Sequence, residues 1–168
     1  MYDERGPLLT CPECEKLYWR DDVSILKSMR GSEYYQKSRR RTLPSAKPIL
    51  AHQFEEAMLQ HFWSDKEQEI YIRVKSWWVF NHAFRSMTDQ DYSLSVHQEN
   101  NVRELARLLD SGDQFQSIMK AEIYRELGEF DACLRELDKT FDNSYSKAVN
   151  TICQLARAGC KHPAKIEH

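Results

Sequence analysis

Apolar residues recur at helical spacing along most of the chain from about residue 49 onward. Val102, Leu105, Ala106 and Leu109, for example, stand at positions i, i+3, i+4 and i+7, which lie on one face of an α-helix. No segment shows a sustained alternation of apolar and polar residues, which is the pattern of a half-buried β-strand. We therefore predict an all-α fold, with helices at about 49–62, 64–85, 98–110, 114–127, 130–141 and 144–158.

Signals for helix starts and stops support these boundaries. Ser64, with Glu67 three residues later, forms a capping-box pattern, which predicts that a helix starts at Ser64. Gly128 and Gly159 each follow the last apolar position of a helical stretch, and glycine adopts the left-handed conformation of a C-cap without steric cost. In the helix at 114–127, the residues predicted to face inward are Phe115, Ile118, Met119, Ile123 and Leu127.

The chain divides into three parts by pattern. Residues 1–35 form an irregular segment that contains Cys11-Pro-Glu-Cys14 and is expected to pack on the body of the protein. Residues 36–48 form a basic loop with two prolines and no apolar periodicity. Residues 49–168 form the all-helical domain.

Residues 121–134, AEIYRELGEFDACL, resemble the turn between the two helices of a tetratricopeptide repeat. The matching positions are Ala121, Leu127, Gly128 and Phe130, and Cys133 stands where that family prefers a small alanine. The resemblance implies a helical hairpin over about 113–147 within a short tetratricopeptide-like array, and a protein that binds peptides or proteins. An ordinary helical hairpin is the alternative, since one repeat alone cannot bury a continuous core.

Composition limits the classes of function. The chain has 168 residues, with 24 Lys and Arg against 26 Asp and Glu, and its formal net charge is −2. This near balance disfavours a surface built throughout for nucleic acid or for an anionic membrane. The five glycines lack the spacing of a phosphate-binding loop, and no apolar run approaches the ~20 residues that cross a bilayer. We expect a cytoplasmic protein without membrane contacts.

Cys11 and Cys14 give the densest chemical signal in the sequence. Two thiolates at this spacing, in a turn that contains a proline, can bind one tetrahedral zinc ion, and the segment looks like half of a zinc ribbon. It departs from that pattern at Glu15, where such motifs often have glycine. Glu13 and Glu15 are expected to raise the pKa of the neighbouring thiols.

A structural zinc site needs four ligands, and elimination suggests the other two. The five cysteines are an odd number without the spacing of a disulfide framework, and Cys133 and Cys153 lie on predicted apolar helix faces. Cys160 and His162 remain, directly after the last helix. We predict a structural Zn²⁺ bound by Cys11, Cys14, Cys160 and His162. The alternatives are a different fourth ligand, from His97, His82 or His61, or a metal-free pair of thiols.

Two further features are candidate contacts with a partner. Adjacent side chains on a helix point about 100° apart, so Trp77 or Trp78 can lie in the core while the other is exposed. Trp78 or Tyr71 is the candidate contact, with core packing as the alternative. The second feature is the cluster of Arg39, Arg40 and Arg41 in the basic loop, which could contact phosphate or an acidic surface, with a solvated loop as the alternative.

These features together predict a non-enzymatic protein–protein interaction module, such as an adaptor, an inhibitor or an immunity-type protein, that carries a structural zinc. The layout resembles bacterial proteins that join a Cys-Pro-x-Cys head to a tetratricopeptide-like tail. The alternative is a binder of nucleic acid or of an acidic partner, which would use the basic residues between 37 and 47 together with the zinc head.

Overall fold

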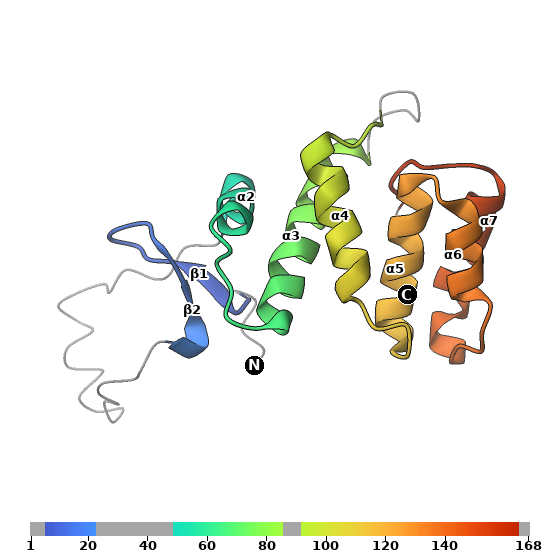
Figure 1. The fold of residues 1–168 in the computed structure, drawn as a ribbon, viewed down its shortest axis with the longest axis horizontal. Helices are drawn as coiled ribbons and strands as arrows, with labels where there is room; N and C mark the ends of the chain where they lie inside the picture. Colours follow the sequence, from blue (N-terminus) through green and yellow to red (C-terminus); the bar gives the residue numbers. More distant parts are fainter. Residues whose placement is uncertain (1–5, 23–48, 86–91, 165–168) are drawn as a thin grey trace, which may run out of the picture. The chain divides into compact units, whose positions relative to one another are not determined.

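The computed structural model of the protein describes residues 6–22, 49–85 and 92–164, and the chain divides into two compact units, Met1–Ala57 and Met58–His168. The first unit contains a β-hairpin, in which β1 (Leu8–Thr10) pairs antiparallel with β2 (Leu17–Trp19), and a 3₁₀ turn, η1 (Arg20–Asp22), follows it (Figure 1). Helix α2 (Ala51–Leu59) starts in this unit, where the Thr10 hydroxyl donates to Gln53 Oε1 over 3.3 Å.

The hairpin differs from the irregular segment that the sequence predicts for residues 1–35. Each strand has only three residues, which is too short to show an alternating pattern. All three residues of β1 are buried, so the strand lacks the polar face that alternation requires. The prediction of a mostly helical chain is confirmed, and the absence of strands from that prediction is wrong.

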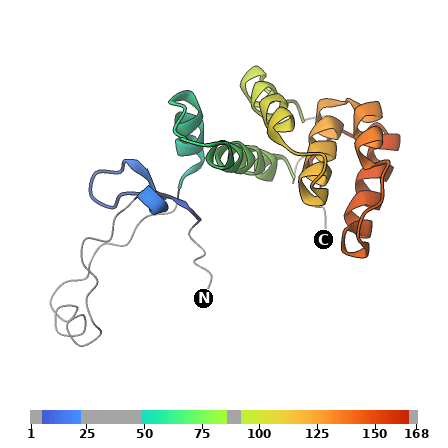
Figure 2. The same cartoon turned by 60° about the horizontal axis from the view of Figure 1, so that its bottom comes forward.

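The second unit is built mainly from helices. They are α3 (Lys66–Phe84), α4 (Val96–Leu108), α5 (Gln114–Leu127), α6 (Phe130–Leu137), η3 (Asn143–Tyr145) and α7 (Ser146–Arg157). Successive α-helices of this unit pack against one another, and α7 also packs against α5 (Figure 1, Figure 2). No helix among the described residues is long and apolar enough to cross a membrane.

Helix α5 contributes to two hydrophobic clusters. The first joins α3, α4 and α5 and contains Val74, Trp77, Val102, Leu105, Ala106, Leu109 and Ile123. The second joins α5, α6 and α7 and contains Ile118, Ala121, Cys133, Leu137, Ala148, Ile152 and Ala156. Because α5 has apolar neighbours on both sides, much of its circumference is removed from water, and this includes positions that carry charged side chains.

The two predicted glycine C-caps are confirmed, whereas the capping box predicted at Ser64 is wrong, and the helix predicted at 130–141 ends at Leu137. Gly128 and Gly159 have φ values of 81° and 68°, and each lies at the left-handed residue that ends a helix. Helix α3, however, starts after Asp65 and not at Ser64. The Asp65 carboxylate accepts the Gln68 backbone N–H at 2.8 Å, while Gln68 Oε1 accepts the Ser64 N–H at 2.8 Å. Asp65 is therefore the N-cap, one residue later than predicted, and the Gln68 side chain bonds back to the residue before the cap.

The residues predicted to face inward are buried or partly buried, with the exception of Phe115. Trp77 is buried at 3% exposure while Trp78 is 40% exposed, so one tryptophan lies in the core and the other faces solvent, as expected from helix geometry. Ile118 and Ile123 are buried in the two clusters. Phe115 was predicted to face inward but is 39% exposed. It lies in the first turn of α5 and lines a groove on the surface of the helical unit.

Candidate functional site

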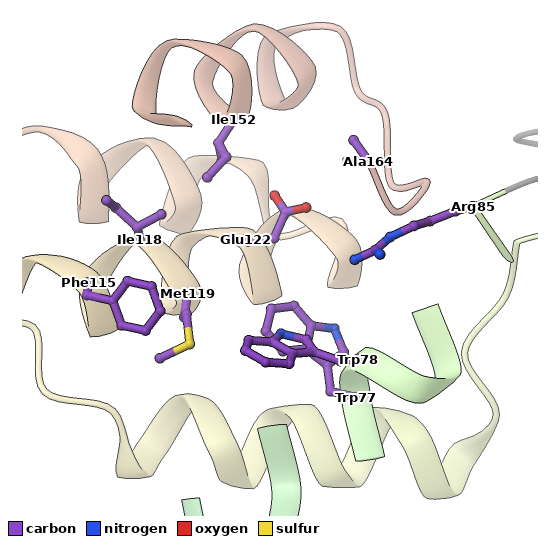
Figure 3. A pocket seen from close by; sticks show the side chains of 9 residues that line it. All are labelled: Trp77, Trp78, Arg85, Phe115, Ile118, Met119, Glu122, Ile152 and Ala164. Carbon is purple, nitrogen blue, oxygen red and sulfur yellow. The ribbon is translucent and has the colours of Figure 1, made fainter. Parts of the chain in front are cut away.

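The surface of the helical unit has a groove lined by every second helix, namely α3, α5 and α7. Its volume is about 290 Å³, and its walls come from α3, α5, α7 and the segment after α7. The lining residues are Trp77, Trp78, Arg85, Phe115, Ile118, Met119, Glu122, Ile152 and Ala164. Phe115 and Met119 face the two tryptophan rings, and the Glu122 carboxylate and the Arg85 side chain extend into the same hollow (Figure 3).

The groove exposes two large aromatic side chains. Trp78 and Phe115 are 40% and 39% exposed, and both line the groove. Exposed aromatic area of this kind is costly in water and is typical of surfaces that bind a partner, since tryptophan is enriched among the residues that dominate binding energy. Sequence reasoning selected Trp78 as a contact, and it missed Phe115 because the periodicity of α5 assigns that position to the core.

A stripe of basic and aromatic residues follows α3 along this face. Tyr71, Lys75, Trp78, His82 and Arg85 are spaced four, three, four and three residues apart, which places them on one side of the helix. The Lys75 ammonium lies 4.8 Å from the centre of the Trp78 ring and 5.6 Å from that of Tyr71. Both Trp78 and Arg85 line the groove, so this side of α3 presents positive charge at its edge.

The floor of the groove contains a buried ion pair. Arg125 is fully buried, and its Nε and Nη2 donate to the two carboxylate oxygens of Glu122 over 2.8 and 2.5 Å. Its Nη1 donates to the backbone carbonyls of Cys160 and His162 over 2.6 and 3.0 Å. Burial opposes the charge of Arg125, but the bonds and charge of Glu122 outweigh it and raise the pKa of the guanidinium. Arg125 therefore fixes the segment after α7 to α5.

A second buried carboxylate, that of Glu126, joins α5 to α3. The Trp77 indole N–H donates to Glu126 Oε2 at 2.7 Å, the Asn81 amide donates to Oε1 at 2.8 Å, and the Tyr92 hydroxyl donates to Oε2 at 3.2 Å. Glu126 is 2% exposed. Burial, together with the negative charge of Glu122, raises the pKa of Glu126 to about 7, against the opposing effect of the Trp77 and Asn81 hydrogen bonds.

Sequence reasoning missed this charged network. Glu122 and Arg125 follow Ile118 by four and seven residues, and Glu126 follows Ile123 by three, so the three charges continue the apolar faces of α5. Their position on the apolar faces was the signal in the sequence that could have indicated a buried charged network. A charged residue on a predicted apolar face is either at the edge of the face or buried with a partner, and a helix packed on both sides favours burial.

The cysteine pair lies in the turn of the β-hairpin. The Cys11 backbone N–H donates to the Lys16 carbonyl over 2.9 Å, and the Glu15 N–H donates to the Cys11 carbonyl over 3.0 Å, which closes the turn between β1 and β2. Glu15 has a φ of 60°, in the left-handed region. This position therefore requires the conformation that glycine adopts most readily, and a glutamate occupies it.

The turn favours the thiolate form of Cys11. Backbone N–H groups of Cys14 and Glu13 donate to the Cys11 sulfur, and they lower the pKa of this thiol, with the Cys14 side chain adding to the effect. Glu13 acts in the opposite direction, as predicted, but its charge is outweighed. The expectation that the glutamates raise the pKa of both thiols is thus wrong for Cys11. Cys11 is half-buried and Cys14 is exposed.

The other two predicted ligands lie in the helical unit. Cys160 and His162 follow α7, and Arg125 binds their carbonyls. His162 Nδ1 lies 3.1 Å from the Pro163 carbonyl, to which it can only donate, and the Nε2 atom is buried. The ring also meets Tyr92 edge-on, with 5.8 Å between ring centres. The set of Cys11, Cys14, Cys160 and His162 joins residues of two units and stays a prediction.

The remaining candidates are placed as follows. Among the described residues, no group of three His, Cys, Asp or Glu side chains could hold a metal ion. The alternative ligands His61, His82 and His97 are exposed in the helical unit. Arg39, Arg40 and Arg41 lie outside the described residues, and the prediction that the basic loop binds phosphate or an acidic surface stays untested.

Comparison of the chain with models of protein families, with curated proteins and with solved structures found no match. The groove, the buried charges beneath it and the cysteine turn are therefore the basis on which a function can be argued.

Proposed function

We propose that this chain is a non-enzymatic interaction module whose helical unit binds a segment of another protein in the groove of α3, α5 and α7. The observation that carries the proposal is the exposure of Trp78 and Phe115, two large aromatic side chains that line the groove. Burying these rings against an apolar side chain would remove unfavourable surface from water, at roughly 25 cal/mol per Å².

The charge of the groove edge specifies the partner segment. Lys75, His82 and Arg85 stand on the same side of α3 as Trp78, and the negative charge of Glu122 on the floor is already paired with Arg125. A complementary segment would insert one large apolar side chain between Trp78 and Phe115 and place acidic residues on either side of it. Such a segment gains apolar burial at its centre and charge complementarity at its rim.

The arrangement of helices supports a tetratricopeptide-like interpretation. Its support is that Ala121 and Cys133 are fully buried and that Gly128 is left-handed at the helix end, where the hairpin motif needs small or permissive residues. The groove is lined by alternate helices, and stacked helical hairpins form concave binding surfaces in the same way. We infer that α5 and α6 form one such unit, flanked by helices that complete its packing.

The buried charges support a binding role rather than catalysis. The oxygens of Glu122 accept from Arg125, and those of Glu126 accept from Trp77, Asn81 and Tyr92. A general acid or base must exchange its proton with a substrate, and these carboxylates are committed to hydrogen bonds within the protein. They stabilise the walls of the groove.

A display experiment tests the groove. Random peptides selected on the full chain should converge on one apolar anchor with acidic neighbours, and their affinity should fall at least tenfold in Trp78→Ala and Phe115→Ala, because large apolar anchors dominate such interfaces. Val79→Ala is the matched control, since Val79 is 38% exposed on α3 but does not line the groove. Peptides that bind all four proteins equally would contradict the proposal.

We also propose that the hairpin turn binds a structural zinc through Cys11 and Cys14. The support is the proximity of the two thiols in one turn and the backbone donors that stabilise the Cys11 thiolate. Purified chain should contain zinc, and Cys11→Ser and Cys14→Ser should lose it, whereas Cys153→Ser, which changes a half-buried thiol on α7, should retain it. Metal-free wild-type protein that gains no zinc on titration would exclude this site.

A further inference from the structure

The cysteine turn supplies half of a zinc coordination sphere at an accessible tip. A structural zinc site is closed by four protein ligands in a tetrahedron, and the turn contributes two thiols. Glu13, Cys14, Glu15 and Lys16 are exposed, so the tip can approach another molecule. The strands behind the tip pair in a fixed register, with Thr10 opposite Leu17, which holds the two cysteine backbones in place.

Two of the other cysteines lie in the interior of the helical unit, and the segment that carries Cys160 and His162 is held in place. All five cysteines are among the described residues, and Cys133 is fully buried in the second hydrophobic cluster, with Cys153 packed against it. His162 donates through Nδ1 to the Pro163 carbonyl, and its Nε2 is buried, so neither ring nitrogen can reach an outside ion unless the segment after α7 moves. Arg125 opposes that movement, because it binds the carbonyls of Cys160 and His162.

We propose that two copies of this chain share one zinc ion, and that each copy contributes Cys11 and Cys14. The inference rests on the proposed binding of zinc by the turn. Two identical turns related by a two-fold axis supply four thiolates in a tetrahedral arrangement, a ligand set that is common for structural zinc. Each thiol releases its proton as it binds, so one Zn²⁺ replaces up to four protons.

The charges around the turn make this association depend on the metal. Each tip carries three charged residues beside the cysteines, Glu13, Glu15 and Lys16, whose formal charges sum to −1. Two such tips repel each other in the absence of a cation, and a divalent ion between them reverses the sign of the interaction. The dimer should therefore form with zinc and dissociate when a chelator removes it.

The test measures mass and metal content together on the full chain. Zinc titrated into metal-free protein should double the 19.9 kDa mass in light scattering, with the end point at one zinc per two chains. A chelator should restore the monomer. Cys14→Ser should abolish both zinc binding and dimer formation, while the double variant with Cys160→Ser and His162→Ala should retain both, with an unchanged end point.

The outcomes separate this inference from the proposals on which it rests. One zinc per chain in a monomer, lost in the double variant, would overturn the shared site in favour of the predicted set with Cys160 and His162. One zinc per chain in a monomer that keeps it in the double variant would overturn the shared site and leave zinc binding by the turn intact. No zinc binding at all would overturn both, and peptide binding in the groove is tested separately.

Discussion

Glu126 is an acidic side chain that is buried in the helical unit. A carboxylate at 2% exposure costs several kcal/mol to desolvate, and the structure offsets this cost with three hydrogen-bond donors from α3 and from the segment before α4. The donors are Trp77, Asn81 and Tyr92. Their arrangement lets Glu126 accept in its ionised form, while burial and the nearby charge of Glu122 raise its pKa and favour its protonated form.

The raised pKa of Glu126 predicts that stability falls as pH rises. With a folded pKa of about 7 and an ordinary value of 4.5, the folded state holds a proton that the unfolded state has released. This contribution is fully present below pH 4.5 and is lost as pH rises through about 7. Its size is on the order of 3 kcal/mol, so the melting temperature should fall by several degrees between pH 5 and pH 8.

Glu126→Gln should remove most of this pH dependence. Glutamine mimics the protonated acid, and the Asn81 Oδ1 atom, which has no hydrogen-bond partner among the described residues, can accept from the new amide once the Asn81 side chain flips. The control is Asp131→Asn, which removes an exposed carboxylate and should leave the slope unchanged. Melting curves at several pH values check this, and an unchanged slope in Glu126→Gln would assign the dependence to other groups.

Residue-level chemistry was only partly accessible from the sequence. Exposure of Trp78 beside buried Trp77 followed from helix geometry, because adjacent positions must face different directions. Burial of Arg125 did not, because it depends on α5 being covered on both sides and on the segment after α7. Such facts arise from tertiary packing, and local periodicity does not report them.

Capping shows how elements are set by competition between neighbouring residues. Ser64, Asp65, Glu67 and Gln68 offer two overlapping caps, and the structure uses Asp65 with Gln68. Asp65 has extended backbone angles, φ −144° and ψ 172°, as a residue at this position requires. Its carboxylate also interacts favourably with the positive end of the helix dipole, which a serine hydroxyl does not.

Substitutions at these positions should rank accordingly. Asp65→Ala removes the side chain that accepts the Gln68 N–H and should lower the free energy of unfolding by about 1 kcal/mol. Ser64→Ala retains the backbone bond from Ser64 to Gln68, and Glu67→Ala changes a residue outside the cap, so both should have smaller effects. Urea denaturation of the three variants checks the order. A larger loss of unfolding free energy in Glu67→Ala than in Asp65→Ala would instead support the Ser64–Glu67 cap that the sequence pattern predicts.

Long helices were predictable and the hairpin was not, for one physical reason. Helices α4 and α5 span three turns or more, so their apolar residues repeat often enough to define a face, and Gly128 marks the end of α5. Strands β1 and β2 have three residues each, and β1 is buried throughout. A short buried strand has no periodicity, and only its pairing with a second segment identifies it.

Every residue of the two hydrophobic clusters lies within the helical unit. Their buried members all lie between Val74 and Ala156, and the partly buried residues packed against them begin at Ile70. Helix α5 belongs to both clusters, and its charged residues bind α3 on one side and the segment after α7 on the other. The unit should therefore unfold as one cooperative body, because loss of α5 would disrupt both clusters.

A fragment of residues 58–168 should accordingly fold without the hairpin unit. We expect a helical circular dichroism spectrum and a single melting transition close to that of the full chain, since the fragment retains every member of both clusters. A shorter fragment that ends at Asp142 lacks Ala148, Ile152 and Ala156 and should melt many degrees lower, because Ile118 and Cys133 lose their packing partners.

Removing the metal with a chelator should leave the melting temperature of the helical unit unchanged in the full chain, if zinc binds only to the hairpin turns. A lower melting temperature of the helices in chelator would instead favour the ligand set that includes Cys160 and His162, because that set would bind the metal to the segment held by Arg125.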